Sequence, residues 1–314
     1  MIACLRSRSA RISGIRPASQ ASYFSVALTI FIRLRRAVII ALVSHPDALL
    51  KTLAGEIERA VKHSHGRPVH DLRISIRRFL QYLETFGRSY PSDKARKISR
   101  RLKKIMNLAG RVRDRDIALR LLQHAGIQRN APVCKMLSEE RKEAERDLRR
   151  YLEHQARRKL LKSSVNVPAA ATVSARRKLL SQVRSYFEAG RKFVSMKASE
   201  KELHRLRIKT KRLRYTLELF RPRYGPRLER YLETLHRIQQ HLGAINDCAV
   251  TAQLVDRALP RRSAARRKLD EFLSRQIKLE KMRLHRYWRT HFDSPGEERR
   301  WIQYLSRGQK RAPK

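Results

Sequence analysis

An internal repeat sets the narrowest limits on how this chain can fold. The segment His70-Asp-Leu-Arg73 recurs as His204-Arg-Leu-Arg207, 134 residues later, and Arg113-Asp114 recurs as Asn246-Asp247, 133 residues later. In both halves a basic segment that begins with His is followed by a second helical segment, a Gly, an Asx-containing loop and two further helical segments. Repetition over such a long period indicates a duplicated structural unit.

The composition predicts that both halves are helical. Hydrophobic residues make up 41% of the chain, which is enough for a core, while Gly and Pro are limited to 11 each. Leu, Arg, Lys, Glu and Ala dominate, and Val, Thr and the aromatic residues do not cluster into alternating strands. We therefore predict an all-α fold.

Signals for helix starts and ends divide the chain into segments. In the first half we expect helices over about 47–62, 69–86, 92–108, 115–124 and 131–161. In the second half we expect helices over about 175–196, 199–220, 226–242, 247–259 and 260–289. The predicted organisation is an extension (1–43), a first repeat (44–161), a small-residue linker (162–174), a second repeat (175–290) and a loose basic tail (291–314).

The extension differs from the rest of the chain because it carries several Arg and no acidic residue. Its two apolar runs, Tyr23–Ile32 and Ala37–Val43, are separated by three arginines, so neither reaches the roughly 20 residues that span a bilayer. The composition is similar to that of a transit peptide. It also fits an upstream extension from a misassigned start, which we favour, and we expect this segment to stand outside the fold.

The net charge points to a polyanionic partner. Lys and Arg number 74 against 28 Asp and Glu, which gives a formal charge of +46 at pH 7. Self-repulsion of such a charge destabilises the compact state, and nucleic acid, an anionic membrane surface or polyphosphate would relieve it.

Cys4, Cys134 and Cys248 are widely spaced and form no CxxC motif, which fits a reducing cytoplasm. We expect the last two to be small buried apolar residues.

The repeated basic segments carry two stripes each. In the first, Leu72 and Phe79 lie on the apolar stripe that faces the core, and Leu83 and Phe86 extend it. The cationic stripe follows i, i+3 and i+7 spacing, so its members share one helix face over roughly 10–15 Å. The first stripe holds His70, Arg73 and Arg77, and the second holds His204, Arg207, Lys211 and Arg214; Arg78 and Arg212 lie off the stripes.

These residue types suit an extended phosphate chain. Arg binds phosphate oxygens through two parallel N–H groups, Lys supplies a mobile charge, and protonated His donates from both ring nitrogens. No aromatic residue interrupts the stripes, so the stripes offer no ring on which a base could stack.

Glu84 and Glu218 lie at the far ends of the stripes. They either orient the cations or form surface ion pairs, such as Glu218 with Arg214. We interpret Asp114 and Asp247 as structural caps of the short helices that follow.

Four segments of the chain resemble those of a known protein family. The segments HDLRISIRR, HRLRIKTKRLRYTLELF, GRVRDRDIAL and LGAINDCAV resemble the CHAD family, the conserved histidine alpha-helical domain, and the likeness runs from about Asp47 to Arg289. The resemblance implies two duplicated antiparallel helical bundles related by a pseudo-two-fold axis. It also implies binding of inorganic polyphosphate in a basic groove, and association with polyphosphate granules.

The resemblance also implies which residues contact the ligand. The first repeat has Leu80 where the second has Arg214, and the second has Ala249 where the first has Asp116, so we expect unequal contributions from the halves. No stretch could hold the strand-rich triphosphatase domain that some family members carry. The implied polyphosphate contacts are His70, Arg73, Arg77, Arg78, His204, Arg207, Lys211, Arg212 and Arg214.

Other chemistries lack their motifs in this sequence. It contains no GxxxxGK[ST] phosphate loop, no HExxH, no paired CxxC and no Gly-x-Ser-x-Gly elbow. Glu233-x-x-His236 matches half of a di-iron motif, which needs a second copy and further Glu. We predict no metal, no cofactor and no catalytic residue.

The sequence therefore predicts a non-catalytic, cytoplasmic protein that binds inorganic polyphosphate, on polyphosphate granules. The alternative is a basic, nucleoid-associated protein that binds nucleic acid without sequence preference, since +46 would attract any phosphate polymer. A third hypothesis is an enzyme acting on polyphosphate or triphosphate, which the lack of an acidic cluster for Mg²⁺ disfavours.

Overall fold

The computed structural model describes residues 46–86, 92–157, 169–195 and 199–307, and these ranges are all-α with no strand. The first half holds α2 (Pro46–Lys62), α3 (Gly66–Phe86), α4 (Ser92–His124) and α5 (Pro132–Arg157). The second half holds α6 (Ala169–Ser195), α7 (Glu200–Leu219), the short α8 (Arg221–Tyr224), α9 (Arg227–Val255) and α10 (Ala264–His291). The extension 1–43 lies outside the described residues.

Local signals explain two of the helix starts. Ser199 and Glu202 form a capping box at the start of α7, where each side chain bonds the other's backbone N–H. Ser263 caps α10 in the same way with one bond, to the N–H of Arg266. Part of the expected linker is helical, because α6 already begins at Ala169; residues 162–168 lie outside the described ranges.

Two predicted interruptions are wrong. α4 runs through Gly110 as one helix of 33 residues, and α9 runs through Gly243 as one helix of 29 residues. A Gly inside a helix costs about 1 kcal/mol relative to Ala, and the burial of apolar side chains on both sides of each Gly outweighs that cost. Asp114 and Asp247 therefore lie inside α4 and α9. The expectation that they cap short helices is wrong.

The expectation of a loose tail is also wrong for residues 297–307. Residues Glu297–Arg307 form α11, which buries Trp301 and Leu305 and packs against α6. The hydroxyl of Tyr224 donates to the carbonyl oxygen of Leu305 at 2.8 Å. The apolar side chains at spacing i, i+4 supply the face that our composition argument overlooked.

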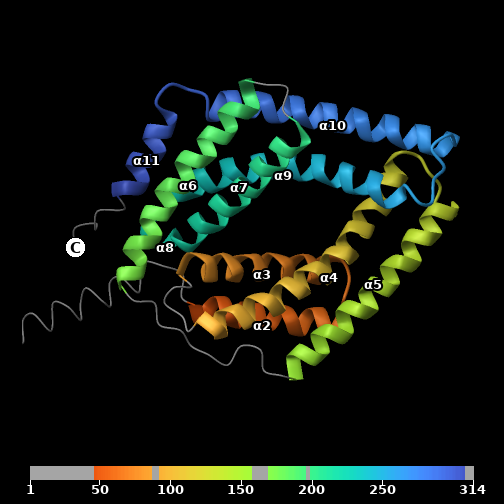
Figure 1. Cartoon of the computed structure of the whole chain (residues 1–314), viewed down its shortest axis with the longest axis horizontal. Helices are drawn as coiled ribbons and strands as arrows, with labels where there is room; N and C mark the ends of the chain where they lie inside the picture. Colours follow the sequence, from red (N-terminus) through yellow and green to blue (C-terminus); the bar gives the residue numbers. More distant parts are fainter. Residues whose placement is uncertain (1–45, 87–91, 158–168, 196–198, 308–314) are drawn as a thin grey trace, which may run out of the picture. The chain divides into compact units, whose positions relative to one another are not determined.

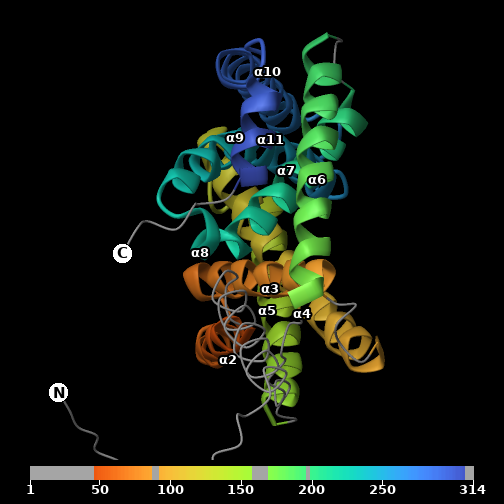
Figure 2. The same ribbon diagram turned by 90° about the vertical axis from the view of Figure 1, so that its left-hand side faces the viewer.

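The same helix pairs form in both halves. α2 packs on α3 and α4 on α5, just as α6 packs on α7 and α9 on α10. The halves meet where α3 contacts α7 and α4 contacts α9, which places these four helices innermost (Figure 1; Figure 2). Phe86 and Phe220, which occupy equivalent positions of the repeat, contact each other with ring centroids 6.2 Å apart. These pairings support the duplication, and the pseudo-two-fold axis stays a prediction.

Two groups of buried side chains hold the helices together. The larger group runs through both halves and includes Leu72, Phe79 and Phe86 of α3 together with Leu206 and Leu213 of α7. The smaller group joins the end of α4 and the start of α5 to the end of α9 and the start of α10. Cys134 and Cys248 are buried free thiols within this second group, as expected.

Candidate polyanion-binding site

Cationic side chains of α3 and α7 come together between the innermost helices. Lys211 shows this best: its pKa is lowered to about 7, by burial first and then by the charges of Arg207, Arg77 and Arg73. Burial, followed by the charge of Arg77, also lowers the pKa of Arg73 to about 10. Four of the nine residues predicted to bind the ligand therefore lie within electrostatic reach of one another.

The structure adds three groups that the sequence argument had not assigned to the site. Arg113 of α4 lowers the pKa of Arg73, and two carboxylates, Asp114 and Asp247, lie among the arginines. Burial raises the pKa of both carboxyls, while the neighbouring arginines act in the opposite direction. We call the combined set the central cluster: Arg73, Arg77, Arg113, Arg207, Lys211, Asp114 and Asp247.

Most cations of the central cluster lack a protein partner. Within the described ranges, Arg77, Arg113 and Lys211 make no hydrogen bond or ion pair, and the Nε of Arg207 is buried without an acceptor. A buried donor without an acceptor costs roughly 1–3 kcal/mol. An anion in the cluster would accept from these donors and remove that cost.

The guanidinium of Arg73 rests against α4. Its Nη1 donates to the carbonyl oxygen of Met106 at 3.2 Å, and a Cβ at Gly110 would lie only 3.0 Å from the same nitrogen. The absence of a side chain at Gly110 is what allows this approach. The repeated Gly that we interpreted as a helix end therefore makes room for a cation of the central cluster.

A pocket of about 270 Å³ opens beside the central cluster in the second half. His204 and Arg207 of α7 line it, together with Asn246 and Ala249 of α9 and Lys281 of α10. His70 is not among its lining residues, so this pocket includes only one of the two histidines predicted to contact the ligand. His70 is exposed on α3, and its pKa is lowered by partial burial and by the charge of Arg113.

Three predicted contact residues are engaged in ion pairs within the protein. Arg78 Nε lies 2.8 Å from an oxygen of Glu218, and Arg214 Nη1 lies 2.5 Å from the other oxygen of that carboxylate. Arg212 Nη2 lies 3.2 Å from Glu84. Glu84 forms an exposed ion pair and Glu218 a largely buried one, and these pairs link α3 to α7. Ligand contacts by these three arginines stay a prediction.

The comparisons with known proteins agree with this architecture. The family model for the CHAD domain matches residues 47–256, which is more than half of the chain. The chain belongs to the CHAD family. The comparison with curated proteins gave no match.

Two solved structures share the fold of this CHAD protein. PptA from Streptomyces chartreusis superposes with a TM-score of 0.56 at 18% identity, covering 78% of this chain and 99% of the other. The CHAD domain from the plant Ricinus communis superposes with a TM-score of 0.52 at 19% identity, covering 86% and 96%. At these identities the likeness concerns the fold alone.

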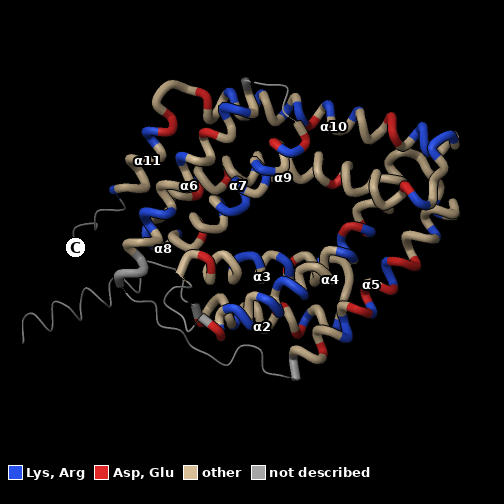
Figure 3. The backbone as a smooth tube through the Cα atoms, viewed as in Figure 1, with Lys and Arg blue, Asp and Glu red and all other residues tan. Residues whose placement is uncertain are grey.

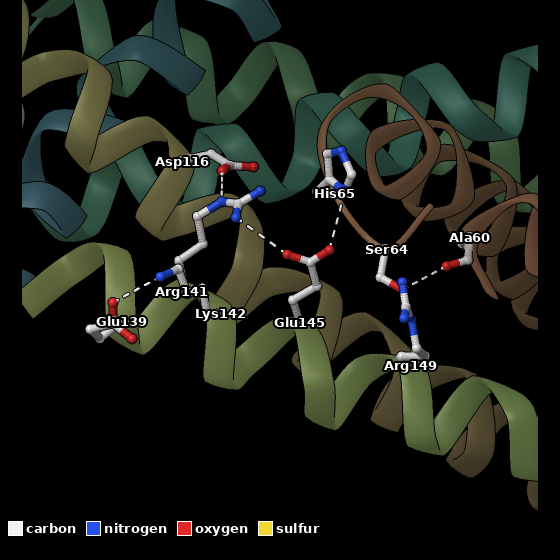
Figure 4. A network of polar contacts seen from close by, with 9 residues as sticks. All are labelled: Ala60, Ser64, His65, Asp116, Glu139, Arg141, Lys142, Glu145 and Arg149. Carbon is white, nitrogen blue, oxygen red and sulfur yellow. Dashed lines mark hydrogen bonds and ion pairs between the residues drawn. The ribbon is translucent and has the colours of Figure 1, made fainter. Parts of the chain in front are cut away.

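The two halves of the CHAD domain differ at Asp116, as the sequence indicated. Asp116 accepts from Arg141 of α5 at 2.5 Å, and Arg141 also pairs with Glu145, which contacts His65 at 3.1 Å (Figure 4). This network fastens α5 to α4 and to the start of α3. The equivalent Ala249 supplies no carboxylate and instead lines the pocket, so the two halves differ beside the central cluster.

Neither a metal site nor a membrane span stands out in the part of the chain that the structure describes. It holds no group of three or more His, Cys, Asp or Glu side chains arranged to bind a metal ion. None of the described helices is long and apolar enough to cross a membrane.

Proposed function

We propose that this CHAD protein binds inorganic polyphosphate without hydrolysing it, and that the ligand occupies the central cluster. The observation that carries the proposal is a set of five cations, drawn from α3, α4 and α7, that surround only two carboxylates and include unpartnered donors. Folding the chain places these like charges together at a cost in free energy. A polyanion would offset that cost.

The arrangement favours a chain of phosphates over a single phosphate. Arg73 and Arg77 lie one turn apart on α3, and Arg207 and Lys211 lie one turn apart on α7, so each helix offers cations about 6 Å apart. His204 and Lys281 continue the basic surface into the adjacent pocket. A polymer can contact all of these groups at once, whereas one phosphate contacts only a few.

Nucleic acid is the competing ligand, and the cluster lacks the features that favour it. The aromatic rings Phe79, Tyr186, Phe220 and Trp288 are buried in the core and cannot stack on bases. Because the central cluster is formed of guanidinium, ammonium and carboxylate groups, it offers contacts to phosphate and none to base faces.

The test is a calorimetric titration of the protein with polyphosphates of defined length, followed by competition. We expect saturable binding that duplex DNA, at equal phosphate concentration and physiological salt, does not displace. Displacement by DNA would support the nucleic-acid alternative. Release of phosphate over hours in the presence of Mg²⁺ would support an enzyme. In cells, a fluorescent fusion is expected to accumulate on polyphosphate granules in the cytoplasm.

A further inference from the structure

One face of α4 leads into the central cluster from outside. Positions 96, 100, 103, 107, 110 and 114 follow one another at intervals of four and three residues, so they lie along a single face of the helix. At the inner end, Gly110 leaves room for the guanidinium of Arg73, and Asp114 belongs to the central cluster. The outer end of this face therefore continues the path of a ligand that passes Arg73.

The outer end of this face is cationic and exposed. Arg96, Arg100 and Lys103 are all exposed to solvent, and Lys and Arg can be followed along α4 as blue segments in Figure 3. Arg96 pairs with Asp93, whereas Arg100 and Lys103 make no ion pair with any described residue. From Arg96 to Gly110 the face is about 21 Å long, at 1.5 Å of rise per residue. We call the three cations Arg96, Arg100 and Lys103 the outer track.

The equivalent face of α9 lacks this row of cations. An offset of 133 residues places Glu229, Glu233 and His236 where α4 has Arg96, Arg100 and Lys103. Both acids are exposed, and they pair with Arg221 and Arg237. These arginines balance the two acids, so the face of α9 offers no surplus of positive charge, whereas the equivalent face of α4 does.

We propose that the outer track binds the part of a polyanionic chain that extends beyond the central cluster, so that a long chain leaves along α4 and not along α9. The proposal rests on the proposed function, because the same polymer occupies both surfaces. The paired acids on α9 give the chain no net attraction, whereas the cations on α4 attract it. The protein thereby binds long chains more tightly than short ones, and it directs them along α4.

The experiment compares two variants that each lose three exposed cations. The track variant carries Arg96→Gln, Arg100→Gln and Lys103→Gln. The control variant carries Lys135→Gln, Lys142→Gln and Arg146→Gln, which lie on one face of α5 and are also exposed. The match is close because in each set one cation pairs with an acid three residues earlier, Asp93 in α4 and Glu139 in α5.

Each protein is titrated with tripolyphosphate and with a long-chain polyphosphate over a range of salt concentrations. For the track variant we expect about tenfold weaker binding of the long chain, a salt slope smaller by about three, and unchanged binding of tripolyphosphate. The control variant is expected to match the wild-type protein within about twofold, and circular dichroism should show full helicity for all three proteins.

The results that would contradict the outer track differ from those that would contradict the proposed function. Equal losses in the track and control variants would mean that only net charge matters, which overturns the outer track. An equal loss for tripolyphosphate and the long chain in the track variant would place these cations in the central site and also overturn it. If the wild-type protein binds neither polyphosphate, the proposed function itself fails.

Discussion

Arg78 of α3 and Glu218 of α7 form an ion pair across the junction of the two halves, with 2.8 Å between Nε and Oε2. The reciprocal pair, Arg212 of α7 with Glu84 of α3, lies at 3.2 Å. Both arginines and both acids are separated by the 134-residue offset of the repeat. Such an exchange of partners is what a two-fold relation between halves produces. The arginines beside the cationic stripes therefore join the halves.

The first prediction concerns the stability that this junction provides. Glu218 is only 9% exposed and pairs with both Arg78 and Arg214, so Glu218→Gln leaves two guanidinium groups without their carboxylate. We expect the free energy of unfolding to fall by about 1–2 kcal/mol. Urea denaturation measures the change.

Glu84→Gln is the matched control. The side chain of Glu84 is 40% exposed and that of its partner Arg212 is 49% exposed, so solvent screens this ion pair. We therefore expect the free energy of unfolding to fall by less than about 1 kcal/mol. Equal losses for the two substitutions would show that burial does not distinguish the pairs.

The second prediction separates ligand binding from general charge. The double substitution of Arg207 and Lys211 by Ala removes two cations of the central cluster, and each charge-assisted contact is worth roughly 1.5–3 kcal/mol. We expect polyphosphate affinity to fall by tens-fold or more while the helical signal in circular dichroism persists.

The control for this substitution lies on the same helix. Lys201 and Arg205 are exposed on α7 and lie outside the central cluster, so their replacement by Ala removes one Lys and one Arg, as in the test variant. We expect a change of about twofold at most, as for screened surface charges. If the two double variants bind equally well, the central cluster is not the site.

Much of the site could be predicted because helical periodicity decides which residues share a face. The i, i+3, i+7 spacing placed Arg73 with Arg77, and Arg207 with Lys211, on one side of their helices. The structure brings these four together, and the buried Leu72 confirms the apolar stripe. Periodicity within one helix sufficed for this part.

The other contacts of the candidate site depend on how the helices pack against one another. The periodicity of a single helix carries no information about that packing. Arg78 and Arg212 have the same residue types as the stripes, and only the contact of α3 with α7 brings Glu218 and Glu84 to them. Asp114 looked like a helix cap because Gly110 looked like a helix end. The repetition of both positions in α9 was the available signal that they serve the interior of the site.

The third prediction uses the two equivalent glycines. Ala favours a helix by about 1 kcal/mol over Gly, and a Cβ at Gly243 would meet no atom within 4 Å. We therefore expect Gly243→Ala to raise the free energy of unfolding by about 0.5–1 kcal/mol and to leave polyphosphate affinity unchanged.

Gly110→Ala should behave differently. Its Cβ would lie 3.0 Å from Nη1 of Arg73, so the guanidinium must shift by a few tenths of an ångström from its place against α4. We expect several-fold weaker polyphosphate binding and a smaller gain in stability, measured by calorimetry and urea denaturation. Identical behaviour of the two variants would show that the position of Arg73 on α4 does not matter for binding.

The fourth prediction follows from the pKa of Lys211, which burial and then Arg207, Arg77 and Arg73 lower to about 7 in the free protein. In the unfolded chain a lysine has a pKa near 10.4. Between these values the unfolded state binds more protons, so this group makes the folded state more stable as pH rises from about 7 to about 10. A bound polyanion favours the charged ammonium and raises the pKa.

Binding should therefore take up protons above pH 7, and affinity should fall as pH rises from about 7 to about 9. Calorimetry in buffers of different ionisation enthalpy measures the proton uptake directly. In Lys211→Arg the charge is permanent, so we expect the variant to bind with no proton uptake in this range. Partial burial and the charge of Arg113 lower the pKa of His70 in the free protein, so this imidazole is not the group that loses its proton above pH 7. If the variant takes up as many protons as the wild-type protein, Lys211 is not the group that the ligand recharges.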